Sequence, residues 1–187
     1  MKRLENTQEG YGAAAIAVHW VMAALLIALI VLGLYMGGLP DVGFDTKKII
    51  LILCHKQFGI FALTLAAVRL VWRLGNALPS LVATLPDWQK VAARFVHLCL
   101  YALMFALPIT GWLMSSATGI PVSFLGLFPL PDLISYDEHL FRTLIEIHKW
   151  LGYALVAFIV AHIAAALEHH FALKDATLKK MLPGSDR

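Results

Sequence analysis

The sequence predicts an all-α integral membrane protein, a bundle of four helices that cross the bilayer up and down. Of its 187 residues 60% are hydrophobic and 14% are charged, and the mean hydropathy is +0.76. Soluble domains have roughly 45–50% apolar and about 25% charged residues. Four apolar segments are each long enough to span a membrane, and turn-forming residues separate them. The length fits one transmembrane domain over residues 1–187.

Each predicted span exceeds the ~20 apolar residues needed to cross ~30 Å of hydrocarbon. The third is expected to begin at a helix cap formed by Pro86-Asp87. The polar N-terminal stretch lacks a small-residue cleavage site before the first span, so we expect this span to be retained and not removed as a signal peptide. The spans cover residues 13–36, 49–74, 88–114 and 140–173.

Basic residues predict the orientation of the bundle. Ten flank the side that holds both termini, and five flank the other side. The excess of positive charge marks the cytoplasmic side, so both termini are expected in the cytoplasm, with the chain in a bacterial inner membrane. A net charge of +3 is too small to indicate a nucleic-acid partner. The ten are Lys2, Arg3, Arg69, Arg73, Lys90, Arg94, Lys174, Lys179, Lys180 and Arg187; the five are Lys47, Lys48, Lys56, Arg142 and Lys149.

The cysteines exclude one class of cofactor attachment. Cys54 and Cys99 lie inside predicted helices, and the sequence has no Cys-x-x-Cys-His motif for covalent c-type haem. We interpret both thiols as small packing groups.

Five histidines fall within the predicted spans: His19, His55, His97, His148 and His162. Ionisable residues inside a membrane are energetically costly and therefore indicate a functional site. His19 and His97 are expected near the cytoplasmic ends of their spans, whereas His55 and His148 are expected near the outer ends. The fourteen residues between His148 and His162 give a rise of ~21 Å and a rotation of about −40°, so both face the same way at two depths.

This placement predicts an outer pair, His55 with His148, and an inner pair in which His162 joins His19 or His97. Paired imidazoles from facing helices are the axial ligands of b-type haem iron. Both outer histidines begin the pattern His-Lys-x-x-Gly, at His55 and His148. A glycine one turn away on the same face leaves room for a flat macrocycle. A zinc site and a cofactor-free proton relay are the alternatives, since the carboxylate motif of a di-iron bundle is absent.

Further polar residues extend the predicted sites. Arg69 follows His55 by fourteen residues and lies at the inner depth, where it can pair with haem propionates or reach lipid phosphates. His169 continues the face of His162 and is a candidate for a hydrogen bond to a quinone carbonyl. The five outer basic residues either attract an anionic electron donor or simply solvate the helix ends.

The chain resembles the bacterial cytochrome b561 family over nearly its whole length. The resemblance is carried by Tyr11-Gly12 before His19-Trp20, by His55 with Arg69-Leu70-Val71-Trp72-Arg73, by His97-Leu98-x-Leu100-Tyr101 running to Leu107-Pro108-x-Thr110-Gly111-Trp112, by His148 and His162, and by His169-His170-Phe171 with Lys174-Asp175-x-Thr177-Leu178.

The resemblance implies two non-covalent haems b and electron exchange with the ubiquinone pool, with a small anionic or protein donor at the outer face. It implies His55 and His148 as ligands of the outer haem iron, and His19 and His162 as ligands of the inner one. His97 would then lie beside the inner haem, near a propionate or the quinone.

Some members of the family oxidise superoxide and reduce ubiquinone, as an oxidoreductase would; this activity is our first expectation. Others are the membrane subunits of hydrogenases or dehydrogenases. A haem sensor and a proton-relay transporter are expectations from other functional classes.

Overall fold

The computed structural model describes residues 4–40, 45–80 and 85–183. It contains four long helices, a short hairpin and a 3-10 turn. All four helices are long and apolar enough to cross a membrane, which confirms the predicted fold class. The elements are α1 (Ala13–Gly37), α2 (Thr46–Gly75), α3 (Asp87–Ala117), β1 (Ser123–Phe124), β2 (Phe128–Pro129), α4 (Glu138–Phe171) and η1 (Lys179–Met181).

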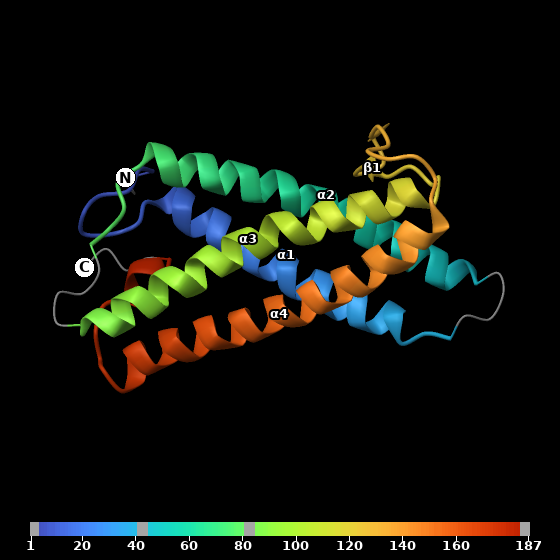
Figure 1. Ribbon diagram of the computed structural model, residues 1–187. Coiled ribbons are helices and arrows are strands. Elements are labelled where there is room, and N and C mark those ends of the chain that lie inside the picture. The colour runs from blue at the N-terminus through green and yellow to red at the C-terminus, as the bar shows by residue number, and fades with distance from the viewer. Residues whose placement is uncertain (1–3, 41–44, 81–84, 184–187) are drawn as a thin grey trace.

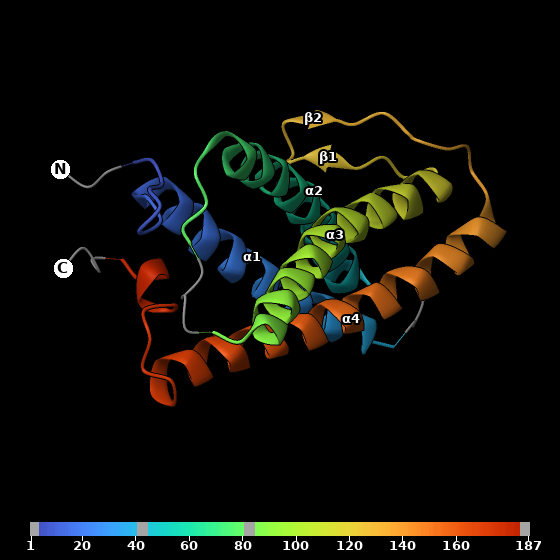
Figure 2. The ribbon, with the colours of Figure 1, turned by 60° about the vertical axis from the view of Figure 1, so that its left-hand side comes forward.

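The helices run up and down as two antiparallel pairs (Figure 1). Helix α1 packs on α2 and α3 packs on α4, and contact between α2 and α3 joins the pairs. Helix α4 packs closely only against α3, so it lies apart from α1 and α2. Both ends of the described chain lie at one end of the bundle (Figures 1 and 2). The cytoplasmic location of this end stays a prediction, and Lys2, Arg3 and Arg187, on which it partly depends, lie outside the described residues.

The helix boundaries differ from the predicted ones for local reasons. Helix α2 begins three residues early, at Thr46, because the Asp45 side chain accepts hydrogen bonds from the backbone N–H groups of Lys47 and Lys48. Helix α3 begins at the predicted Pro86-Asp87 cap, with Pro86 as the capping residue and Asp87 in the first turn, and no side-chain hydrogen bond closes this cap.

A small apolar core joins α1, α2 and α3. Met22 of α1, Ala66 of α2 and Met104 of α3 are buried against one another. Many large apolar side chains are instead exposed on the outside of the bundle, as expected where lipid and not water is the solvent. The core therefore joins three helices between the two depths at which the histidines lie.

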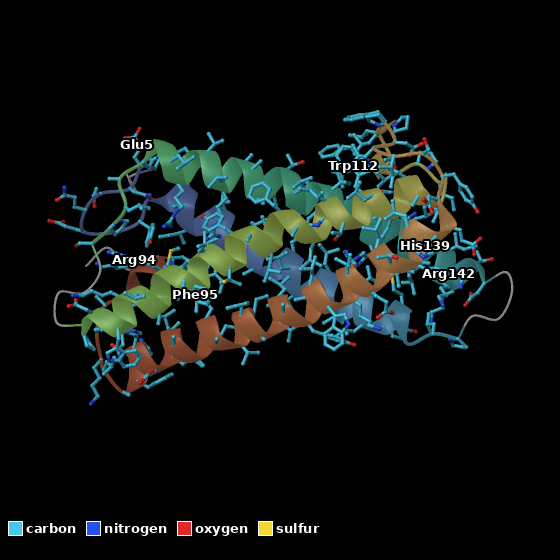
Figure 3. The ribbon with its side chains drawn as sticks, in the orientation of Figure 1. Glu5, Arg94, Phe95, Trp112, His139 and Arg142 are labelled. Atoms are coloured by element: carbon cyan, nitrogen blue, oxygen red, sulfur yellow. The ribbon has the colours of Figure 1, made fainter. Side chains whose placement is uncertain are left out.

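The connection between α3 and α4 contains the hairpin, which the sequence did not predict. Its turn places Leu125 and Gly126 at φ 47° and 73°, and the Leu127 N–H donates to the Phe124 carbonyl at 2.8 Å. The Trp112 indole N–H donates to the Pro131 carbonyl at 3.0 Å and ties the loop to α3. In Figure 3 Trp112 lies at the hairpin end of the bundle, whereas Arg94 lies toward the end with the termini.

The C-terminal segment after α4 folds back across the end of the bundle where the termini lie. The Trp20 indole N–H donates to the Met181 carbonyl at 2.7 Å, and Lys180 Nζ donates to the Ser80 carbonyl at 3.0 Å. These bonds connect the tail to α1 and to the segment after α2. The tail therefore covers the helix ends nearest to the inner histidines.

Candidate functional site: two layers of histidines

Every helix carries two polar or glycine positions fourteen residues apart, and the structure gathers these eight positions into two layers. Fourteen residues are about four helical turns, a rise of ~21 Å with nearly no change of face. The layers lie on either side of the Met22 core, and the tail-covered one is the inner layer. The outer layer consists of Gly33, His55, Gly111 and His148, and the inner layer of His19, Arg69, His97 and His162.

The outer layer brings His55 and His148 together, as the sequence predicted. Their ring centres lie 6.2 Å apart and the ring planes are inclined by 76°. Glycines of the neighbouring helices leave space for both rings. A Cβ added at Gly33 would lie 3.2 Å from His55 Cε1, and one added at Gly111 would lie 3.5 Å from His148 Cε1.

The two outer imidazoles differ in their hydrogen bonds. His148 Nδ1 lies 3.0 Å from Thr110 Oγ1, whose hydroxyl donates to the Leu107 carbonyl at 2.9 Å. By contrast, the buried Nδ1 of His55 has no partner among the described residues.

The inner layer contains three histidines. The ring centres of His19 and His162 lie 6.2 Å apart, with planes inclined by 66°. Those of His97 and His162 lie 5.2 Å apart. His162 thus faces two candidate partners, as the sequence predicted. The His97 side chain is exposed, whereas His19 and His162 are half-buried.

Arg69 lies in the inner layer, as its spacing from His55 predicted. Its Nη2 atom is 3.0 Å from His19 Nδ1, and its Nε atom donates to the Tyr101 hydroxyl at 3.2 Å. The guanidinium groups of Arg69 and Arg73 also lie over the Tyr101 ring, 5.8 and 5.5 Å from its centre. Arg69 is therefore oriented into the bundle by α1 and α3 and does not extend toward lipid phosphates.

The spacing of each pair can be compared with that of two imidazoles on one iron. A histidine nitrogen binds a first-row metal at about 2 Å, and the ring centre lies roughly 1.1 Å behind that nitrogen, so ligands on opposite sides of one iron have ring centres about 6.2 Å apart. The His55–His148 and His19–His162 pairs have this separation. The His97–His162 pair is too close by about 1 Å.

Hydrogen bonding and spacing disagree about the inner pair. A guanidinium only donates, so the Arg69 contact makes His19 Nδ1 an acceptor and puts the proton on Nε2, the nitrogen that would face an iron. We give more weight to the spacing, because an arginine side chain can turn away while the helices stay in place. Widening the His97–His162 distance requires the helices themselves to move.

The two glycines of the His-Lys-x-x-Gly patterns adjoin open space. A Cβ added at Gly59 or Gly152, the glycines of the two His-Lys-x-x-Gly patterns, would meet no atom within 4 Å. The outer pair joins α4 to α2, and the inner pair joins α4 to α1. Helix α4 does not pack closely against either of these helices. The residues present therefore fit a haem held between α4 and the α1–α2 pair at each depth.

His169 lies at the inner end of α4, where its side chain is 14% exposed. Its Nδ1 atom is 2.6 Å from Asp175 Oδ2 of the tail. Burial raises the pKa of Asp175, but hydrogen bonds from Thr177 and His169 outweigh this effect and hold the pKa below its ordinary value. The carboxylate thus orients His169, and the sequence had not predicted this partner.

The outer basic residues differ in whether a carboxylate neutralises their charge. Lys149 Nζ and the guanidinium of Arg142 each pair at 2.6 Å with a carboxylate of their own helix, those of Glu146 and Glu138. Lys56, the neighbour of His55, is half-buried, and its Nζ donates to the neutral Ser115 hydroxyl at 3.0 Å. Lys56 is therefore the outer cation whose charge is best placed to act near the outer pair.

The sequence analysis assigned no role in the site to Gly33, Gly111 or Thr110, which lie beside the outer imidazoles, although Thr110 and Gly111 belong to a segment that carries the family resemblance. A signal was available, because each glycine lies fourteen residues after a histidine of the same helix, His19 or His97. The contacts themselves depend on the register between helices, which a single sequence does not give.

Comparison with known proteins gives matches over nearly the whole chain. The family described as prokaryotic cytochrome b561 matches residues 10–184. Cytochrome b561 homolog 2 of Escherichia coli (strain K12) is 36% identical over 178 residues, which cover 95% of this chain and 93% of that protein. Cytochrome b561 homolog 1 of the same organism is 32% identical over 186 residues, or 98% of both chains. A protein of Yersinia pestis named probable superoxide oxidase CybB is 29% identical over 174 residues, 92% of this chain and 96% of that one.

Proposed function

Because this chain belongs to the prokaryotic cytochrome b561 family, we propose that it holds two haems b and passes electrons from a donor at the outer face to ubiquinone at the inner face. Membership and the four spans make it a multi-pass, haem-binding electron-transport protein of the bacterial inner membrane. The observation that carries the proposal is the equal 6.2 Å spacing of two imidazole pairs at two depths.

In this proposal His55 and His148 hold the outer haem, and His19 and His162 hold the inner one. Each haem iron, when bound, accepts and releases one electron at a time. The protein orients the imidazoles by helix packing, and Arg69 and His97 supply polar groups at the inner layer. Arg69 is the cation available to the haem propionates there.

The donor we propose is superoxide. Lys56, half-buried and next to His55, provides positive charge at the outer layer for a small anion. A relative that aligns over 96% of its own length is named a probable superoxide oxidase, which supports the same donor. Two superoxide anions each lose one electron and become dioxygen, and ubiquinone takes up both electrons together with two protons from the inner side.

The inner side has a group suited to that proton uptake. His169 lies on the same face of α4 as His162, about two helical turns further toward the inner end. The Asp175 carboxylate accepts a hydrogen bond from His169 Nδ1. A protonated His169 can donate from Nε2 to a quinone carbonyl while Asp175 balances its charge. We therefore assign the quinone site to the end of α4 beside the tail.

The experiment is rapid mixing of the purified haem-loaded protein with superoxide, with the haem absorption bands as the readout. We expect superoxide to reduce the haems within seconds of mixing. Superoxide dismutase should abolish this reduction, and added ubiquinone should reoxidise the haems. Haems that stay oxidised with superoxide but are reduced by ubiquinol would contradict the proposed donor and direction.

A further inference from the structure

The two halves of the bundle repeat one another. Aligning residues 14–37 of α1 with 92–115 of α3 places His19 on His97 and Gly33 on Gly111, with identical residues at ten of the 24 positions. In the same way His55 of α2 corresponds to His148 of α4. The packing repeats as well, since a Cβ added at Gly33 or Gly111 meets the same two atoms, Cε1 and Nδ1, of the facing imidazole.

The residue that precedes Gly33 in one half and Gly111 in the other is polar in only one of them. Thr110 of α3 corresponds to Leu32 of α1. The Thr110 hydroxyl proton is donated to the Leu107 carbonyl at 2.9 Å, so its oxygen accepts from the N–H at Nδ1 of His148, 3.0 Å away. Leu32 has no polar side-chain atom to offer, and the buried Nδ1 of His55 has no partner in the described part of the chain.

We propose that Thr110 is a positioning residue that makes the two outer imidazoles unequal haem ligands. It fixes the proton of His148 on Nδ1 and turns Nε2 toward the iron, while His55 ligates without this support. This inference rests on the proposed function, because it takes His55 and His148 as the ligands of the outer haem.

The inequality has a consequence for the outer potential. A hydrogen bond accepted from the distal N–H makes a histidine a stronger donor to its metal. A stronger donor stabilises the oxidised iron and so lowers the reduction potential. Removing the acceptor at position 110 should therefore raise the potential of the outer haem, and adding one at position 32 should lower it.

The test is a spectroelectrochemical titration of both haems in reciprocal variants of the whole protein. Thr110→Val is expected to change the outer reduction equilibrium about threefold to tenfold toward the reduced form, where tenfold corresponds to 59 mV for one electron. Leu32→Thr is expected to shift it in the opposite direction, and Thr110→Ser to restore the original value. The inner potential should stay unchanged in all three. Thr64→Val, which removes a hydroxyl that donates to the Ile60 carbonyl of its own helix, is the matched control.

An unchanged outer potential in Thr110→Val and Leu32→Thr, with both haems bound, would overturn the proposal. So would equal shifts of both haems. If Thr110→Val lost its haem, Leu32→Thr and Thr110→Ser would still decide the matter. The ligand assignment is tested separately by His148→Ala, because an outer haem retained in that variant refutes the proposed function and not merely the role of Thr110.

Discussion

The ring centres of His19 and His162 lie 6.2 Å apart, although their helices, α1 and α4, do not pack closely against each other. His55 and His148, at the other depth, have the same separation. In both cases the imidazoles approach across a part of the bundle that backbone packing leaves open. This geometry supports the proposal that two bis-imidazole sites share helix α4.

The inner ligands are tested first, because His97 competes with His19. We expect His19→Ala to lose the low-spin electron paramagnetic resonance signal of the inner haem. His97 should not replace the lost ligand, because the ring centres of His97 and His162, 5.2 Å apart, are too close for an iron between them. His97→Ala should keep both low-spin signals and change only the inner potential or the quinone kinetics. The reverse pattern, with the inner signal lost in His97→Ala alone, would show that the hydrogen-bond criterion and not the spacing identifies the ligand.

The glycines of the outer layer give a matched pair of variants. An alanine at position 33 places its Cβ 3.2 Å from the His55 ring, so the ring must move, whereas an alanine at position 111 makes an ordinary 3.5 Å contact with His148. Gly33→Ala should weaken retention of the outer haem, with a cost of about 1–3 kcal/mol from overpacking. Both variants gain the same helix propensity, so the difference isolates the contact. Equal haem retention during thermal unfolding would contradict it.

Lys56 should determine the rate at which an anionic donor reaches the outer site. We expect Lys56→Gln to lower the second-order rate constant with superoxide about tenfold at low ionic strength and to flatten its salt dependence. Lys149→Gln is the control, because Glu146 already pairs with that exposed lysine. Stopped-flow measurement of haem reduction over a series of salt concentrations gives the rate constant and its salt dependence for each variant. Equal effects of the two substitutions would indicate a general surface charge effect.

Asp175 should couple quinone reduction to pH. Its pKa is lowered in the folded protein, so its contribution to stability is present above its unfolded pKa and is lost as the pH falls through the folded value. At neutral pH the Asp175 carboxylate accepts from His169 Nδ1 and orients the imidazole. Asp175→Asn should therefore slow ubiquinone reduction, and the difference between the variant and the unsubstituted protein should shrink at low pH, where Asp175 becomes protonated. If Asp175→Asn had a normal haem content and reduced ubiquinone at the original rate, His169 would not be part of the quinone site.

Much of the fold could be predicted from the sequence, because a chain in lipid needs long apolar helices and these have a strong compositional signal. The outer pair could be anticipated from matching His-Lys-x-x-Gly patterns. The Asp45 cap of α2 and the two-residue strands were not predicted, since each depends on a few local hydrogen bonds. The choice between His19 and His97 depends on inter-helix distances of 6.2 and 5.2 Å, which no spacing along the chain encodes.

The most direct test of the two-layer arrangement is a haem count that is resolved by site. Pyridine-haemochrome analysis against protein mass should give two haems for each chain in a fully loaded preparation. His55→Ala and His148→Ala should each reduce the count to one and spare the inner haem, because the two layers share only α4 as a ligand-bearing helix. A saturated wild-type protein with a single haem, or loss of the inner haem in His55→Ala, would contradict the arrangement proposed for this chain.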